Sequence, residues 1–195
     1  YIAPEPNLIQ TNEATGSLDG LGSIVGGIRY PLNFSMLMKG SGAAGTPPEW
    51  GKVLKCCSWA EVVTAAAVPV AAEAATAGDE TTVTGGAGFA ATAQLYRGMP
   101  LLLSGNPAAG AVTFVTDYTA GKVFTLADSY DTPLDINTDL QIPANVLYRP
   151  VSSAIPCATV WLYVDGIVWK LQDWRGTMSL AIEAGGIGRF TFNGT

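Results

Sequence analysis

The stretch 160–171 most strongly constrains what this chain can fold into. Two runs of β-branched and aromatic residues lie on either side of Asp165-Gly166. Asp and Gly tolerate the positive φ angles of a type I′ turn, so this pattern is a strong short-range signal for a β-hairpin. Two further runs, 177–182 and 189–192, alternate apolar and polar or small residues, as a sheet with one buried face does. We therefore expect a four-stranded meander at the core of the fold.

The composition favours a mainly β protein that works in an assembly. The chain has 195 residues, and 48% of them are hydrophobic, which excludes a disordered chain. Only 13% are charged, about half the usual share in soluble domains. Because a surface poor in charge is often covered by partners, we expect an oligomer. The 23 Gly and 12 Pro residues among short β-like runs favour an all-β fold. No apolar run approaches the ~20 residues of a membrane-spanning helix, so we expect no membrane association.

The chain contains no histidine, which removes the usual general base and the commonest metal ligand. It also lacks a phosphate-loop pattern and a Cys-x-x-Cys pair. We therefore expect no enzyme activity, no cofactor and no bound metal. The three cysteines, Cys56, Cys57 and Cys157, do not suggest a disulfide framework, so we expect free buried thiols in a reducing compartment. Because the first residue is Tyr1 rather than Met, we expect a processed or partial chain.

The first 29 residues are rich in Pro, Gly and polar residues, which predicts an extended arm or loop with at most one weak strand. This arm lies either on a neighbouring copy or on its own subunit, and the sequence favours neither. Residues 30–39 then alternate cleanly and predict a half-buried strand. The residues that share its apolar face are Tyr30, Leu32, Phe34, Met36 and Met38.

A short helix is predicted between Thr46 and Ser58. Thr46 and Glu49 have the spacing of a capping box, and Pro47 suits the first helical position because its missing N–H would be unpaired there. An apolar stripe at helical spacing is expected to face a sheet. Its members are Trp50, Val53, Leu54 and Cys57. A strand is expected from residue 60 to residue 64.

The middle of the chain has a pattern of its own. Residues 65–78 are Ala-rich and contain Pro69 and Gly78, which predicts a linker. Residues 81–143 then show short β-like runs with turns between them, at a spacing that suits a small barrel or sandwich. These runs are 93–96, 100–103, 112–116, 122–126 and 140–142. Residues 146–148 return the chain to the main sheet.

Charge separates this middle segment from the rest of the chain. Between residues 71 and 146 there are 8 acids and 2 bases, whereas the remainder holds 8 of each. The net charge of −6 therefore belongs to the middle segment. We expect a discontinuous β core formed by residues 1–70 and 146–195, and an inserted acidic β-module formed by residues 71–145.

Acidic and glycine-rich patterns suggest binding sites, but each has a plainer interpretation. Five acids of the module supply oxygen ligands of the kind that hold a hard cation. Their spacing does not match a calcium-binding loop, and turns with a solvated acidic face explain them better. These acids are Asp117, Asp128, Asp131, Asp135 and Asp139. The Gly185-Gly186-Ile187-Gly188 segment is similar to a dinucleotide fingerprint, but no helix is expected after it, so we predict a turn.

The tryptophans and cysteines also suggest binding sites, and each has a plainer interpretation. Trp161, Trp169 and Trp174 could line a sugar-binding groove, although packing in the core or against another subunit explains strand tryptophans better. Cys56 and Cys57 are too few for a zinc site.

Three stretches share their order and spacing with one known family. Residues 39–57 contain a Gly-Ser-Gly turn followed by Thr-Pro-Pro-Glu-Trp-Gly, and residues 148–153 read Tyr-Arg-Pro-Val-Ser-Ser. The closing stretch contains Val164-Asp-Gly166, Arg175-Gly-Thr177 and, at 189–194, Arg-Phe-Thr-Phe-Asn-Gly. Together these segments resemble the tail tube proteins of long-tailed bacteriophages. The resemblance covers residues 28–64 and 146–194.

The resemblance implies a β-sandwich or barrel of the tail tube type with one short flanking α-helix. It implies that six copies form a ring and that rings stack into a tube that conducts the genome. The implied partners are further copies, other phage tail proteins and DNA that passes through without specific binding. The implied location is the tail of the virion, after assembly in the host cytoplasm. A channel for DNA should hold phosphate weakly, and no basic run occurs in this sequence.

The middle segment departs from the family pattern, in which the strand after the helix passes almost directly to the Tyr-x-Pro-Val-Ser segment. Residues 71–145 are similar to a small β-module found in many phage virion proteins. Two other functions stay open. One is another ring-forming virion protein, such as a head–tail connector or a tail terminator. The other is a binding module, in which residues 80–145 recognise a carbohydrate or a cation.

Overall fold

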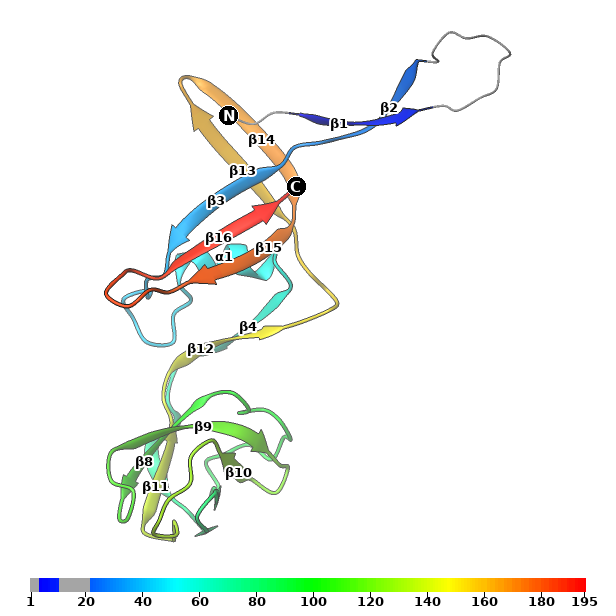
Figure 1. The fold of residues 1–195 in the computed structure, drawn as a ribbon. Helices are drawn as coiled ribbons and strands as arrows, with labels where there is room; N and C mark the ends of the chain where they lie inside the picture. The colour runs from blue at the N-terminus through cyan, green and yellow to red at the C-terminus, as the bar shows by residue number, and fades with distance from the viewer. Residues whose placement is uncertain (1–3, 11–21) are drawn as a thin grey trace. The chain divides into compact units, whose positions relative to one another are not determined.

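The structure is a computed structural model that describes residues 4–10 and 22–195. The described chain is mainly β, as predicted, with one α-helix among these residues (Figure 1). It divides into two compact units. Unit 1 comprises residues 1–39, 49–60 and 150–195, and unit 2 comprises residues 40–48 and 61–149.

Unit 1 combines short strands with the single helix. Its elements are β1 (Glu5–Gln10), β2 (Ser23–Arg29), β3 (Leu32–Leu37), α1 (Glu49–Lys55), β13 (Ala158–Val164), β14 (Ile167–Trp174), β15 (Gly176–Ala181) and β16 (Arg189–Gly194). Two pairs of strands, β1–β2 and β13–β14, form separate hairpins. The other three form a sheet of order β15–β16–β3.

The three-stranded sheet buries aromatic side chains against α1. Phe192 on β16 lies opposite Phe34 on β3, and their ring centroids are 5.4 Å apart. Trp50 on α1 lies 4.6 Å from the Phe190 ring. Trp174 is buried next to Phe34. The predicted half-buried strand is confirmed but shorter. The predicted helical stripe faces the sheet through Trp50, and Leu54 and Cys57 of the same stripe are buried.

The predicted four-stranded meander is wrong. β13 and β14 pair as predicted, with positive φ at Asp165 (46°) and Gly166 (78°). However, β15 pairs with β16 rather than with β14, and β3 completes that sheet on the other side of β16. The register of β13–β14 shifts near its end, where Asp173 adopts φ 60°. Such a bulge bends a strand, so the chain leaves the hairpin before β15 begins.

The predicted capping box is also wrong. The helix begins at Glu49, and the Glu49 carboxylate lies 3.2 Å from Lys39 Nζ. The backbone N–H of Thr46 donates to the carbonyl of Ala43. The reason lies in the two consecutive prolines. A residue that precedes proline is disfavoured in the helical conformation. Pro47 precedes Pro48 and lies outside the helix, which starts at Glu49.

Unit 2 has a core of its own beneath a curled seven-stranded sheet, drawn mainly in green in Figure 1. Its strands are β5 (Val68–Ala74), β6 (Ala77–Gly78), β7 (Thr82–Thr84), β8 (Pro100–Gly105), β9 (Ala111–Tyr118), β10 (Val123–Leu126) and β11 (Thr138–Ile142). Their order is β5–β11–β8–β9–β10–β7–β6. Burial alternates along β8, β9 and β11, as expected for strands with one covered face. Phe124 is central to the core, with its ring 4.6 Å from Tyr118 and 4.9 Å from Phe89.

Two strands contain the ends of the longer segment of unit 2, residues 61–149. β4 (Trp59–Thr64) and β12 (Asn145–Pro150) pair with each other as a two-stranded ribbon. The Tyr148 hydroxyl donates a hydrogen bond of 2.7 Å to the Glu61 carboxylate across this ribbon. The two ends of the 61–149 segment are therefore neighbours.

Two predictions for the middle of the chain are wrong. Residues 65–78 are not a linker, because β5 pairs with β11 and β6 pairs with β7. The Ala-rich composition does not specify this order, which for β5 depends on a partner strand distant in sequence. Residues 93–96 form turns rather than a strand, and Tyr96 packs in the core beside Tyr118. Unit 2 spans residues 61–149 rather than the predicted 71–145, and it also includes residues 40–48, which we expected in the β core.

Candidate interaction surfaces

The β13–β14 hairpin presents apolar side chains on both faces. Successive side chains of a strand point to opposite faces, so the register assigns each residue to one of them. One face carries Val160, Leu162, Val164, Ile167, Trp169 and Leu171, and the other carries Trp161, Tyr163, Val168 and Lys170. Ile167 on the first face is 59% exposed, and Tyr163 on the second face is 73% exposed. Both faces thus leave large apolar groups in contact with water.

This hairpin lacks the usual support of a strand pair. Within the described ranges, no third strand pairs with β13 or β14. An isolated two-stranded hairpin is marginally stable in water and needs further strands or a packed surface. Lys170 Nζ lies 5.2 Å from the centre of the Trp161 ring, so its alkyl chain and charge partly cover one face. The opposite face carries no charged side chain.

The β1–β2 hairpin in the N-terminal segment also exposes apolar side chains on both faces. The prediction of at most one weak strand within residues 1–29 is wrong, although residues 1–3 and 11–21 lie outside the described part. Leu8 lies opposite Val25, and Ile9 lies opposite Ile24 on the other face. All of the residues in both strands are exposed.

The sequence carried only a weak signal for this second hairpin. In β1, the apolar pair Leu8-Ile9 follows Pro6 closely. In β2, the apolar pair Ile24-Val25 is followed by Gly26-Gly27. Proline and glycine usually mark breaks in strands. Here the register shifts between Pro6 and Leu8, and this bulge accommodates the glycine pair. The matched apolar pairs, Leu8-Ile9 and Ile24-Val25, could have revealed the pairing.

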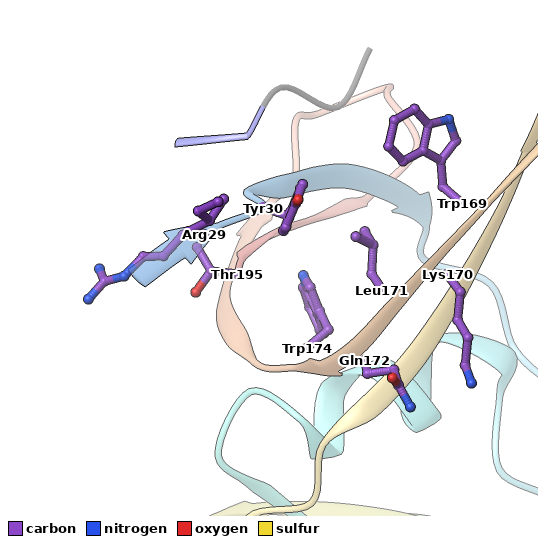
Figure 2. Close-up of a pocket in the computed structure, with 9 residues that line it drawn as sticks. Arg29, Tyr30, Trp169, Lys170, Leu171, Gln172, Trp174 and Thr195 are labelled. Carbon is purple, nitrogen blue, oxygen red and sulfur yellow. The ribbon is translucent and has the colours of Figure 1, made fainter. Parts of the chain in front are cut away.

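A hollow of about 450 Å³ lies in unit 1 beside β14. Figure 2 shows Tyr30, Leu171 and Trp174 around it, whereas the Arg29 and Lys170 side chains point away. Trp169 also lines it, from the same hairpin face as Leu171. The hollow is thus an aromatic depression that continues one apolar face of the β13–β14 hairpin.

The three candidate tryptophans do not form a common groove. Trp174 is 1% exposed, and its indole N–H donates to the Leu32 carbonyl at 3.3 Å. Trp169 and Trp161 lie on opposite faces of the hairpin. A sugar-binding groove lined by all three side chains is therefore excluded by the register.

The candidate acidic cluster is dispersed over unit 2. Asp117 accepts a hydrogen bond from the Gln94 side chain, and Asp135 accepts one from the Asn137 backbone N–H. In the described part of the chain, no group of three Cys, Asp or Glu side chains is placed to hold a metal ion. The segment at 185–188 forms a turn between β15 and β16, as predicted.

Burial keeps the Cys57 thiol and the Tyr118 phenol in their neutral forms. Cys56 and Cys57 are buried, and burial raises the pKa of the Cys57 thiol to about 11. Burial also raises the pKa of Tyr118 to about 12, and its hydroxyl donates to the Ala90 carbonyl at 2.6 Å. Such thiols and phenols are poor nucleophiles at neutral pH. The prediction that all three thiols are buried is wrong for Cys157, which precedes β13 and is exposed.

These features define a class: a mainly β protein of two units, in which unit 1 exposes apolar hairpins and unit 2 has a closed core. Comparisons with protein-family models, curated proteins and solved structures find no match for this chain. No helix in residues 4–10 and 22–195 is long and apolar enough to cross a membrane.

Proposed function

We propose that this chain is a structural subunit of a phage tail tube. In this tube, copies close into rings, for which the family resemblance implies six copies, and the rings stack around a channel for the genome. The observation that carries the proposal is the β13–β14 hairpin, which is apolar on both faces and has no third strand among the described residues. A ribbon of this kind requires a covering surface.

Identical copies are well suited to supply that surface. A repeated contact between copies that closes into a ring pairs every exposed strand edge with the next subunit and leaves none open. The low charge of the chain, 13% of residues, agrees with a surface that is largely covered in the assembly. Most of the sequence that resembles tail tube proteins lies in unit 1, the unit that carries the exposed hairpins.

A passive channel is consistent with the charge of unit 1. Unit 1 contains seven acidic and seven basic residues and is neutral overall. Each Lys or Arg contact with phosphate adds affinity that does not depend on sequence and would slow the passage of DNA. The proposed role is therefore structural rather than catalytic, and the proposed location is the virion tail.

Sedimentation velocity of the purified chain over rising protein concentration, combined with negative-stain micrographs, tests this function. The proposal predicts conversion to rings and tubes as concentration rises. Rings that never lengthen would favour a head–tail connector or tail terminator instead. A single monomeric species at the highest concentration would contradict every ring-forming function.

A further inference from the structure

The net charge and the exposed apolar hairpins belong to different units. Unit 2 contains nine acidic and three basic residues, which accounts for the whole net charge of −6. Unit 1 is neutral and carries both exposed hairpins. A neutral surface with exposed apolar groups favours indiscriminate association, whereas a net charge far from zero opposes it.

Two of the three basic residues of unit 2 bond to backbone carbonyls rather than to acids. Lys122 Nζ donates to the Gly86 carbonyl at 2.8 Å, and the Arg149 guanidinium donates to the carbonyls of Leu95 and Arg97. These cations therefore serve backbone acceptors in unit 2. Across the described ranges, Glu80, Asp128 and Asp131 are exposed and have no Lys or Arg within ion-pair distance.

We propose that unit 2 is an electrostatic spacer that keeps finished assemblies from associating side by side. This inference rests on the proposed function, because it assumes an assembly in which each copy presents unit 2 on the outer surface. Repulsion between two copies of unit 2 follows the product of their charges. Halving the charge of each copy therefore reduces the repulsion to about a quarter.

A charge-neutralised full-length chain tests the spacer. The triple variant Glu80→Gln, Asp128→Asn, Asp131→Asn changes the net charge from −6 to −3 at exposed positions. The matched control, Glu80→Asp, Asp128→Glu, Asp131→Glu, changes the same positions and keeps −6. Side-by-side association is measured as the fraction pelleted at low speed and as bundles in micrographs.

Salt provides a second measurement that needs no variant. Raising NaCl from about 0.01 M to 1 M shortens the screening length from about 30 Å to 3 Å. We expect the parent and the control to bundle only at high salt, and the neutralised variant to bundle at a several-fold lower salt concentration. Identical salt dependence of the neutralised variant and the parent would overturn the spacer.

Sedimentation velocity at low salt separates this inference from the proposed function. If rings or tubes form and their bundling changes neither with salt nor with the triple substitution, the spacer is rejected. The proposed function as a tube subunit is then unaffected. If the parent chain stays monomeric and the neutralised variant precipitates at lower salt than the parent, the function as a tube subunit is rejected. The repulsion between copies of unit 2 is then still supported.

Discussion

Val164 lies directly opposite Ile167 in the β13–β14 register, one on each side of the Asp165-Gly166 turn, and the two side chains are 50% and 59% exposed. They share their face with Leu162 and Trp169 and with no charged side chain. Under the proposed function, this pair is covered by a neighbouring copy.

A charge placed on this face should block assembly without unfolding the chain. For Ile167→Glu, we expect circular dichroism like that of the parent, because exposed substitutions usually change stability by no more than about 0.5 kcal/mol. Sedimentation velocity should show loss of rings and tubes, because burying an unpaired carboxylate costs several kcal/mol. The control Ser129→Glu adds the same charge at an exposed position of unit 2. Normal assembly of Ile167→Glu would contradict the role of this face.

The two units should lose structure separately when one core is damaged. Phe124 is fully buried, and the core cluster around it contains residues of unit 2 alone. We expect Phe124→Ala to destabilise unit 2 by roughly 3–5 kcal/mol. All five tryptophans belong to unit 1, so their fluorescence reports on that unit. In urea, the circular dichroism transition of unit 2 should shift while the tryptophan transition stays in place. A common shift of both signals would show that the cores unfold as one.

Gly194 should not tolerate a side chain. A Cβ there would meet the Arg175 carbonyl oxygen and would lie 2.7 Å from Cε2 of the buried Trp174 ring. Neither group can move freely, so we expect Gly194→Ala to lower the unfolding free energy of unit 1 by about 1–3 kcal/mol. Gly186→Ala is the matched control, because its nearest neighbours lie at an ordinary 3.5 Å. Equal tryptophan unfolding midpoints for the two variants would refute the close packing at Gly194.

The hydrogen bond between Tyr148 and Glu61 should make stability depend on alkaline pH. Burial, then the bond to Glu61, raises the pKa of Tyr148 above its ordinary value of 10. Because the folded pKa is the higher one, the stabilisation is complete below about pH 10 and is lost as pH rises further. Tyr148→Phe should cost about 1 kcal/mol near neutral pH. Urea unfolding in a series of alkaline buffers should show a shallower loss for Tyr148→Phe than for the parent. Parallel losses would mean that Tyr148 does not titrate in this way.

Sequence patterns within a short stretch predicted the turn, the strands and the helix that such stretches specify. The Asp165-Gly166 turn and its flanking aromatic runs fixed the β13–β14 hairpin, and strict alternation located β3 and β16. The apolar stripe of α1 was predicted because its spacing matches the helical period. The sequence also placed Trp161 and Trp169 on the hairpin strands. Alternation alone, however, does not reveal which face of a strand is exposed to solvent.

Strand partners depend on contacts that the sequence does not display. The bulge at Asp173 separates β14 from β15, and β3, far earlier in the chain, then completes the sheet beside β16. The Ala-rich β5 becomes a strand because β11 pairs with it. The β1–β2 hairpin was missed because its apolar runs are short and interrupted by proline and glycine.

Electron cryo-microscopy of the assembled full-length chain tests the central claim most directly, because it shows what covers each β13–β14 hairpin. We predict that a strand or sheet of a neighbouring copy contacts the face that carries Val164 and Ile167. Copies that meet only through unit 2, with both hairpin faces left in solvent, would contradict this claim.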